Sequence, residues 1–316
     1  MSSIQHPSLY ETHSDQEFRE TLLGPKLNEV GLGDLEKLIF SQSCRGIYEM
    51  DPSQQKRGSG HDSQTHFSRI NFRSLVRGCK NPFQILFENY HDTLEYLVGM
   101  QGVMNQNPNV AKNLVLGNMF ALLKDRFSST DEAVEFIQDL HHATLTLTRP
   151  FQRQEYGSHC EVKDEPLPYF RNILVPNDQM EEIRGERFNP GLLYPLPLFV
   201  KAGDKEDNID FHLFNKVRRT GKKETVLRNL FEGYLLLFGL LDAPEVGETP
   251  IPNMHPSYTT SNYRRDYVQN LINGLGEDIG KLRHNLCKSI NYSRAEIGLV
   301  QIKARELYDQ IKSQNS

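Results

Sequence analysis

Segment 268–290 carries four residues that could bind a cofactor if they lie on one helix. Gly276, Gly280 and His284 follow one another at intervals of four residues, and Cys287 comes three residues after the histidine. Residues spaced by three and four share one face of a helix. Haem iron is commonly held by one histidine, and two glycines leave a smooth face for a flat cofactor. The pattern predicts a haem site at His284; close packing of another helix on the glycines and a solvated histidine are the alternatives.

A stripe of apolar residues predicts which side of the same segment faces the protein interior. At about 100° per residue these side chains form one continuous stripe along a helix, and such a stripe packs on the core. His284 points away from the stripe, so we expect its imidazole outside the core. The stripe consists of Val268, Leu271, Ile272, Leu275, Ile279, Leu282, Leu286 and Ile290.

A second candidate centre is His91, in the segment NPFQILFENYHDTLEYL. His91 and Glu95 lie one helical turn apart on one face. With Ser41 or Ser43 upstream, the order of these residues resembles the Ser…His-x-x-x-Glu motif of bacterial effector AMP-transferases, which is an alternative to haem chemistry. The same histidine and glutamate could also form half of a metal site.

Two further histidines, His61 and His66, could complete such a metal site. They belong to segment 51–66 (DPSQQKRGSGHDSQTH), which is polar and rich in glycine and serine. This composition is typical of an exposed loop. We therefore expect both histidines to be solvent-exposed.

The elements that must position these residues are predicted to be helices. Apolar residues recur at helical spacing, and no segment shows the strict alternation of a half-buried strand. Ser129 and Glu132 form a capping-box pattern ahead of an apolar run to Leu147, and Ser261 is expected to be the N-cap of a late helix. The fold class is therefore all-α, a helical bundle with helices predicted within 26–50, 68–100, 109–126, 129–147, 223–241, 261–292 and 294–312.

Residues 149–208 are expected to form a long irregular segment. They hold seven of the 16 prolines, in stretches such as PLPYF and NPGLLYPLPLF. Their aromatic and aliphatic residues are too numerous for a disordered segment. We therefore predict an ordered loop that packs on the helices and forms the wall of a pocket.

The composition indicates a globular protein of a reducing compartment. The chain of 316 residues has a net charge of −5, which argues against nucleic-acid binding. Its four widely spaced cysteines fit neither a disulfide framework nor a zinc site. The sequence shows no signal peptide and no membrane-spanning run, so we expect a cytoplasmic protein without a membrane partner. Residues 1–24 are expected to be a loosely attached arm, and residues 25–316 a single helical domain.

Five stretches between residues 165 and 292 are similar to those of a known family. In chain order they are Ile183–Gly185, Pro190–Leu193, Pro197–Val200, Glu206–Leu240 and Leu282–His284. They resemble the tryptophan/indoleamine 2,3-dioxygenase superfamily, above all its biosynthetic haem enzymes. The first three stretches resemble the substrate-loop region, the fourth resembles the helix that follows, and the last resembles the arginine and proximal histidine of the family.

The resemblance implies a haem enzyme that oxidises or rearranges an aromatic amino acid or an indole derivative with O₂ or peroxide. A b-type haem would be ligated by His284. Gly276, Gly280 and Arg283 would contact the cofactor, and Cys287 could attach it through a thioether bond. In such enzymes the cofactor supplies the chemistry, and the protein positions the substrate.

The resemblance also implies roles on the substrate side. His91 would be the distal acid or base. Arg184 and Arg187 could hold a substrate carboxylate, and Tyr194 and Phe199 could stack on an aromatic ring.

A third interpretation involves no catalysis. The late helices carry charged stretches such as RRDY and KARELYDQ, which would suit an interaction protein that self-associates. A homo-oligomer is equally compatible with the enzymatic interpretation.

Overall fold

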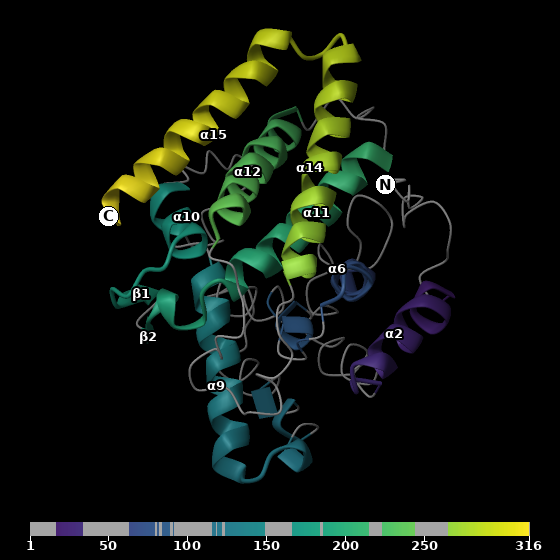
Figure 1. Cartoon of the computed structure of the whole chain (residues 1–316), viewed down its shortest axis with the longest axis vertical. Helices are drawn as coiled ribbons and strands as arrows, with labels where there is room; N and C mark the ends of the chain where they lie inside the picture. The colour runs from purple at the N-terminus through teal and green to yellow at the C-terminus, as the bar shows by residue number, and fades with distance from the viewer. Residues whose placement is uncertain are drawn as a thin grey trace, which may run out of the picture.

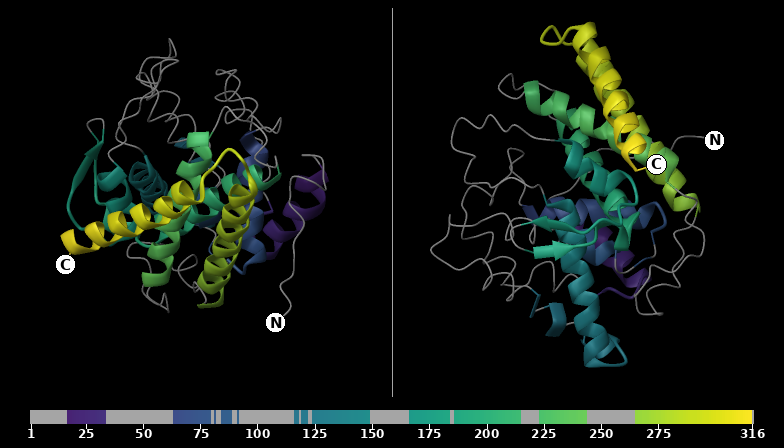
Figure 2. Two further views of the ribbon diagram at one scale, coloured as in Figure 1. Left: turned by 90° about the horizontal axis from the view of Figure 1, so that it is seen from above. Right: turned by 90° about the vertical axis from the view of Figure 1, so that its left-hand side faces the viewer.

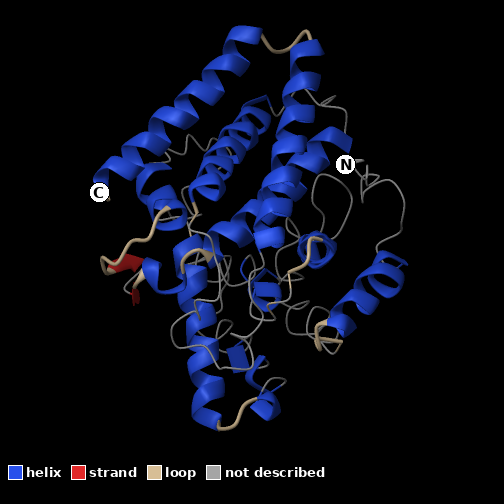
Figure 3. Ribbon diagram, viewed as in Figure 1, coloured by secondary structure: helices blue, strands red, loops and turns tan. Residues whose placement is uncertain are grey.

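The computed structural model of the chain describes residues 17–33, 63–79, 81, 84–88, 91, 116–117, 119–121, 124–148, 166–183, 186–214, 223–243 and 265–315. Helices dominate these residues (Figure 3). Their strands, β1 (Glu181–Ile183) and β2 (Glu186–Phe188), form a small antiparallel hairpin. The all-α prediction is therefore confirmed.

The central helix of the fold is α11 (Leu196–Phe214). It packs against α6 (Ser63–Val76), α12 (Lys223–Asp242) and α14 (Arg265–Lys288), and α15 (Arg294–Gln314) lies along α12 (Figure 1). One hydrophobic core joins these helices. Because α11 is covered on several sides, its polar side chains must find partners on the neighbouring helices rather than in water.

The predicted apolar stripe of α14 faces this core. Leu271, Leu275 and Leu286 are buried, as are Ile279 and Leu282, while Val268 and Ile272 are partly buried against the core. Ile290 was placed in the stripe incorrectly, because its side chain is fully exposed. The helix ends at Lys288, so Ile290 lies in the turn before α15, where helical periodicity no longer applies.

Helix α9 (Thr130–Leu147) begins at the predicted cap. The Ser129 hydroxyl accepts a hydrogen bond from Glu132 N at 3.2 Å, and the Glu132 carboxylate accepts one from Ser128 N at 2.9 Å. These bonds satisfy amide groups that have no partner inside the helix. Figures 1 and 2 place the start of α9 at the end of the molecule opposite the α14–α15 turn.

The prediction of a long loop over residues 149–208 is wrong for most of the residues in that range that the structure describes. Helix α10 (Pro166–Leu174), the β1–β2 hairpin, the short helix η4 (Pro190–Leu193) and most of α11 occupy residues 166–208. Prolines stand at the first positions of these helices, as Pro166, Pro190 and Pro197 show. A proline in the first turn removes no helical hydrogen bond, so counting prolines as helix breakers was misleading here.

Residues 1–24 were expected to form a loosely attached arm. Residues 17–24, the part of it that the structure describes, pack on the core. Helix η1 (Phe18–Leu23) buries Phe18 and Leu23, and the ring of Phe18 meets Phe72 of α6 edge-on at 5.4 Å. The chain continues directly into α2 (Gly24–Glu29). Residues 1–16 lie outside the described part.

The remaining helical predictions agree with the structure where it describes them. In the predicted segment 68–100, helix α6 starts earlier than expected, and residues 84–88 are also helical. In the predicted segment 109–126, residues 116–117 and 119–121 are helical. A 3-10 turn, η2 (Lys124–Arg126), follows them. No helix in the described ranges combines the length and apolar character that a membrane span requires.

Candidate active site

Four buried polar side chains from three separate parts of the chain meet inside the protein. Because the backbone of each lies in a helix, only the side chains are free to form these contacts. We call this group the Glu88 cluster. It consists of Ser74 of α6, Gln84 and Glu88 of the helical residues 84–88, and Tyr267 in the first turn of α14, all of them buried.

Local sequence features position the members of the Glu88 cluster. Gln84 and Glu88 stand four residues apart, so their side chains share a helix face. Asn81 caps this helical stretch, since its side-chain oxygen accepts a hydrogen bond from Gln84 N at 3.4 Å. On α6, Asn71 and Ser74 stand three residues apart and face the same carboxyl.

The Glu88 carboxyl accepts hydrogen bonds at both oxygens. Its Oε1 accepts from Ser74 Oγ at 2.6 Å and from Gln84 Nε2 at 2.6 Å. Its Oε2 accepts from the Asn71 amide at 3.2 Å when that amide is oriented with its nitrogen toward Glu88 and Ile85 O. Donors of this kind compensate part of the free energy lost when a carboxylate leaves water.

Burial nevertheless raises the pKa of Glu88 to about 7, although the hydrogen bonds from Gln84 and Ser74 act in the opposite direction. The side chain therefore exchanges its proton near neutral pH, as a general acid or base must. Burial also raises the pKa of the nearby Cys79 thiol and of the Tyr267 phenol. Both groups stay protonated at neutral pH, so Cys79 is not an activated nucleophile.

His91, the predicted acid or base, lies in direct contact with this cluster. Its Nδ1 is 3.0 Å from the carbonyl oxygen of Glu88, and its ring meets Phe87 edge-on at 6.0 Å. A carbonyl oxygen can only accept a hydrogen bond, so Nδ1 must carry the proton. In the neutral ring the lone pair is then on Nε2, which is the arrangement of a base.

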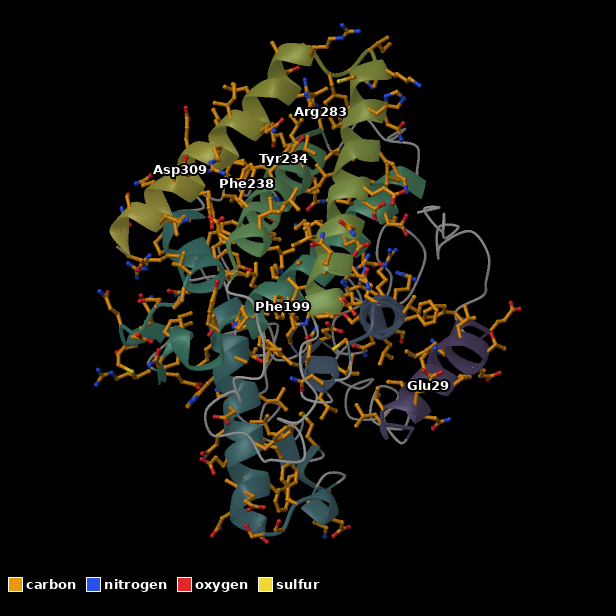
Figure 4. The ribbon with its side chains drawn as sticks, in the orientation of Figure 1. Glu29, Phe199, Tyr234, Phe238, Arg283 and Asp309 are labelled. Atoms are coloured by element: carbon orange, nitrogen blue, oxygen red, sulfur yellow. The ribbon has the colours of Figure 1, made fainter. Side chains whose placement is uncertain are left out.

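Phe199, the predicted stacking residue, reaches the cluster through Tyr267. The two rings meet edge-on at 5.9 Å, and the Tyr267 hydroxyl is 2.5 Å from Gln84 Nε2. Figure 4 shows Phe199 beside the end of α14 that carries Tyr267. The structure thus brings His91 and Phe199 to one cluster, although they are far apart in the sequence.

A separate set of buried ions joins α6 to α11 next to this cluster, and it begins at His66. We expected His66 in an exposed loop; instead it is fully buried in α6. Its Nδ1 is 2.6 Å from Asp207 Oδ2, and its Nε2 is 3.1 Å from Asp204 Oδ1. Charge on the neighbours, from Lys201 beside Asp204 and from Arg69 beside Asp207, outweighs burial and keeps the pKa of both carboxyls well below normal. Both ring nitrogens of His66 therefore face carboxylate oxygens of α11.

Three arginines continue the set along α6 at intervals of four residues. Arg69 Nε is 3.2 Å from Asp207 Oδ1, Arg73 Nη2 is 2.5 Å from Asp210 Oδ2, and Arg77 pairs with Glu206. Arg69 and Arg73 of α6, and Arg77 just after it, thus meet carboxylates of α11, and Lys201 pairs with Asp204. Since these carboxylates are paired inside the protein, we interpret this α6–α11 ion network as structural rather than as a binding site for a charged ligand. Its members are His66, Arg69, Arg73 and Arg77 with Asp204, Glu206, Asp207 and Asp210.

The residues predicted to bind haem lie along α14, mostly on its exposed side. His284 and Arg283 are exposed, and Cys287 is a half-buried free thiol. Arg283 donates to Gln301 of α15 at 3.4 Å. A Cβ at Gly276 would touch Leu237 of α12 at 4.0 Å, whereas a Cβ at Gly280 would meet no atom within 4 Å.

Imidazole and thiol groups suit haem iron, but the described residues provide no second wall opposite Gly280. Within the same described part, no group of three His, Cys, Asp or Glu side chains could hold a metal ion. Haem ligation by His284 therefore stays a prediction. The other proposed metal and AMP-transferase residues, Ser41, Ser43, His61 and Glu95, lie outside the described residues.

The length of α14 separates the predicted haem ligand from the Glu88 cluster. His284 comes 17 residues after Tyr267 on one continuous helix (284 minus 267), which corresponds to about 25 Å at 1.5 Å per residue. In Figure 4, Arg283 and Phe199 accordingly lie near opposite ends of α14. The two predicted centres are distinct places on the protein.

The other predicted substrate residues do not join the Glu88 cluster. Tyr194 donates a hydrogen bond to Leu174 O at 3.3 Å, and burial followed by the charge of Asp242 raises its pKa to about 12. Arg187 is exposed on β2. Arg184 lies outside the described residues.

The sequence analysis missed Glu88 itself and its partners. A usable signal was present, because Gln84 and Glu88 are polar residues at helical spacing inside the apolar run PFQILFENY. Ser74 and Tyr267 carried no such signal.

No known family, curated protein or solved structure matches the chain. The evidence for function is therefore the chemistry of the site.

Proposed function

We propose that the chain is an enzyme that transfers a proton to or from an aromatic substrate, with His91 and Glu88 as the acid–base pair. The observation that carries the proposal is the buried Glu88 carboxyl, whose pKa is raised to about 7 one helical turn from His91. Titratable groups with strongly shifted pKa values gather at catalytic sites. The carboxylates of the α6–α11 ion network, in contrast, are paired with basic side chains.

In this proposal His91 Nε2 accepts a proton from an activated carbon atom of the substrate. The imidazolium that forms is stabilised because Nδ1 keeps its bond to Glu88 O and because the Glu88 carboxyl group is close to the ring. Glu88, whose carboxyl is partly protonated at neutral pH, supplies the proton that the product needs. Each group then returns to its starting state by exchanging a proton with water.

An aromatic substrate is the class that the surroundings favour. The ring of Phe87 meets His91, and the ring of Phe199 meets Tyr267 of the Glu88 cluster. Aromatic rings prefer such edge-on and offset contacts with other rings. This choice agrees with the aromatic substrate that the sequence analysis predicts for His91 and Phe199.

Deuterium exchange tests the proposal because it detects proton transfer at carbon whatever product is formed. The protein is incubated in D₂O with aromatic amino acids, aromatic 2-oxo acids and indoles, and deuterium incorporation at carbon is measured by NMR. Loss of an acid–base group should reduce the rate about 10²–10⁴-fold, so Glu88→Gln and His91→Gln should be nearly inactive. Glu277→Gln, at an exposed position of α14, is the matched control and should exchange normally.

Two results would contradict the proposal. One is full exchange activity in Glu88→Gln and His91→Gln. The other is a wild-type protein that neither binds nor exchanges any compound of the panel.

A haem enzyme is the second candidate, because His284 is exposed and Cys287 is a free thiol one turn later. Bound haem would supply oxidative chemistry at that face of α14. One equivalent of hemin should give the wild-type protein a Soret band, and His284→Ala should lose it while Glu277→Gln keeps it. Haem that remains on the denatured chain, but is released from Cys287→Ser, would indicate the thioether bond. A wild-type spectrum equal to that of free hemin excludes this candidate.

A further inference from the structure

Tyr267 is the member of the Glu88 cluster that has no direct bond to the carboxyl. It belongs to α14, whereas Ser74 belongs to α6 and Gln84 to the helical residues 84–88. Its oxygen accepts a hydrogen bond from Gln84 Nε2, and the same nitrogen donates to the Glu88 carboxyl. Tyr267 therefore contacts the carboxyl only through this amide.

The direction of each hydrogen bond follows from the chemistry of the groups. Gln84 Nε2 has two hydrogens and donates one to Glu88 Oε1 and one to the Tyr267 oxygen. Ser74 has one hydrogen, which it donates to Glu88 Oε1.

These bonds form a relay that ends on the carboxylate. The Tyr267 oxygen fixes the Gln84 amide that donates to the Glu88 carboxyl. A donor held in place in this way favours the charged form of its acceptor. We infer that Tyr267 is a positioning residue that stabilises the ionised Glu88 carboxyl through Gln84.

The inference deepens the proposed function and rests on it for its catalytic meaning. It implies that Glu88 acts as an acid–base group only while α14 is packed against the helical residues 84–88, where Tyr267 meets Gln84. Besides Tyr267, the titratable groups that face Glu88 in the described part of the chain are Cys79, His91 and Arg77. The change Tyr267→Phe leaves all three in place and keeps the ring against Phe199, so it removes the relay alone.

Carbon-13 NMR of a protein labelled at its glutamate carboxyls measures the effect directly. The Glu88 signal is the one that disappears in Glu88→Gln. In the wild-type protein its titration midpoint is expected near pH 7, and Tyr267→Phe should move that midpoint about one pH unit higher, the effect of one lost hydrogen bond. Tyr308→Phe, whose hydroxyl binds Asp242 at the α12–α15 contact, should leave it unchanged.

A second variant keeps the test decisive if Tyr267→Phe does not fold. Gln84→Leu interrupts the same relay, since Gln84 joins Tyr267 to Glu88, and should also raise the midpoint. If both variants fold, their combination should raise the midpoint by less than the sum of the two, because they act through one path. An unchanged midpoint in either single variant overturns the inference.

The two proposals fail in different ways. The NMR titration does not depend on turnover, so a shifted midpoint without any deuterium exchange keeps the relay and removes the proposed function. Deuterium exchange that requires Glu88, together with an unchanged titration midpoint in Tyr267→Phe, keeps the proposed function and removes the relay. A Glu88 carboxyl that does not titrate between pH 5 and 9 contradicts both.

Discussion

His66 Nδ1 lies 2.6 Å from Asp207 Oδ2, and this contact joins α6 to α11 where both side chains are fully buried. The same carboxylate also accepts from Arg69 at 3.2 Å. One aspartate thus contacts two side chains of α6. The attachment of α6, which also carries Ser74 of the Glu88 cluster, depends on it.

Asp207→Asn should lower the free energy of unfolding by about 3 kcal/mol, because removing one partner leaves buried cations uncompensated. Urea denaturation at pH 7 measures this change. Asp309→Asn is the matched control: Asp309 forms an exposed pair with Arg305, and such pairs contribute less than about 1 kcal/mol. Equal effects of the two substitutions would show that the α6–α11 ion network does not stabilise the fold.

The ion network also predicts a loss of stability in acid. The pKa values of Asp204 and Asp207 are well below normal in the folded protein. A carboxyl of this kind stabilises the fold above its unfolded-state pKa of about 4, and the stabilisation is lost as the pH falls below that value. The free energy of unfolding should therefore decrease from pH 5 toward pH 3, and less steeply in Asp207→Asn.

Two glycines of α14 should respond in opposite ways to alanine. A Cβ at Gly274 would stand 2.8 Å from Arg77 Cζ and 3.0 Å from Glu206 Oε1. Gly274→Ala should therefore displace the ion pair of Arg77 and Glu206 and destabilise the protein by about 2 kcal/mol or more. At Gly280 no atom stands within 4 Å, and Gly280→Ala should stabilise the helix by about 0.5–1 kcal/mol. Thermal denaturation of the two variants tests the pair, and destabilisation by Gly280→Ala would indicate that something covers that face.

Asp139 of α9 should make the protein less stable as the pH rises. Its side chain is buried, burial and the charge of Glu135 raise its pKa to about 7, and its Oδ2 has no hydrogen-bond partner among the described residues. A carboxyl with a raised pKa favours the folded state at low pH, and that contribution disappears between about pH 4 and pH 7.

The corresponding variant is Asp139→Asn, which cannot ionise. Its stability relative to wild type should increase from pH 5 to pH 8 in denaturation experiments. Asp131→Asn, at an exposed position of the same helix, should show no such trend. A constant difference across the pH range for Asp139→Asn would mean that Asp139 has a partner in the folded protein.

Cys79 and Cys287 should differ in their reaction with iodoacetamide. Burial raises the pKa of Cys79, and only the thiolate reacts. Cys287 is half-buried and free. Mass spectrometry of the native protein should find the Cys287 peptide modified first and the Cys79 peptide modified only after unfolding. Rapid labelling of Cys79 under native conditions would contradict the burial of the Glu88 cluster.

Local sequence determined the helices whose signals are local. The apolar stripe of α14 from Leu271 to Leu286 follows from helical periodicity, and the start of α9 follows from the hydroxyl of Ser129 and its acceptance of an amide three residues later. These features depend on residues within one or two turns of each other. The same signal fails at Ile290, where the helix has ended.

Only the tertiary structure decided the environment of the polar residues. His66 stands in a sequence typical of a loop, yet α11 supplies two carboxylates that make its burial favourable. Glu88 acquires its raised pKa because the segments packed around it exclude water from its carboxyl. Tyr267 lies 183 residues from Gln84, its hydrogen-bond partner, and no local pattern predicts such a contact. A charge or a proton in the interior depends on everything packed around it, whereas a helix depends mainly on its own few turns of chain.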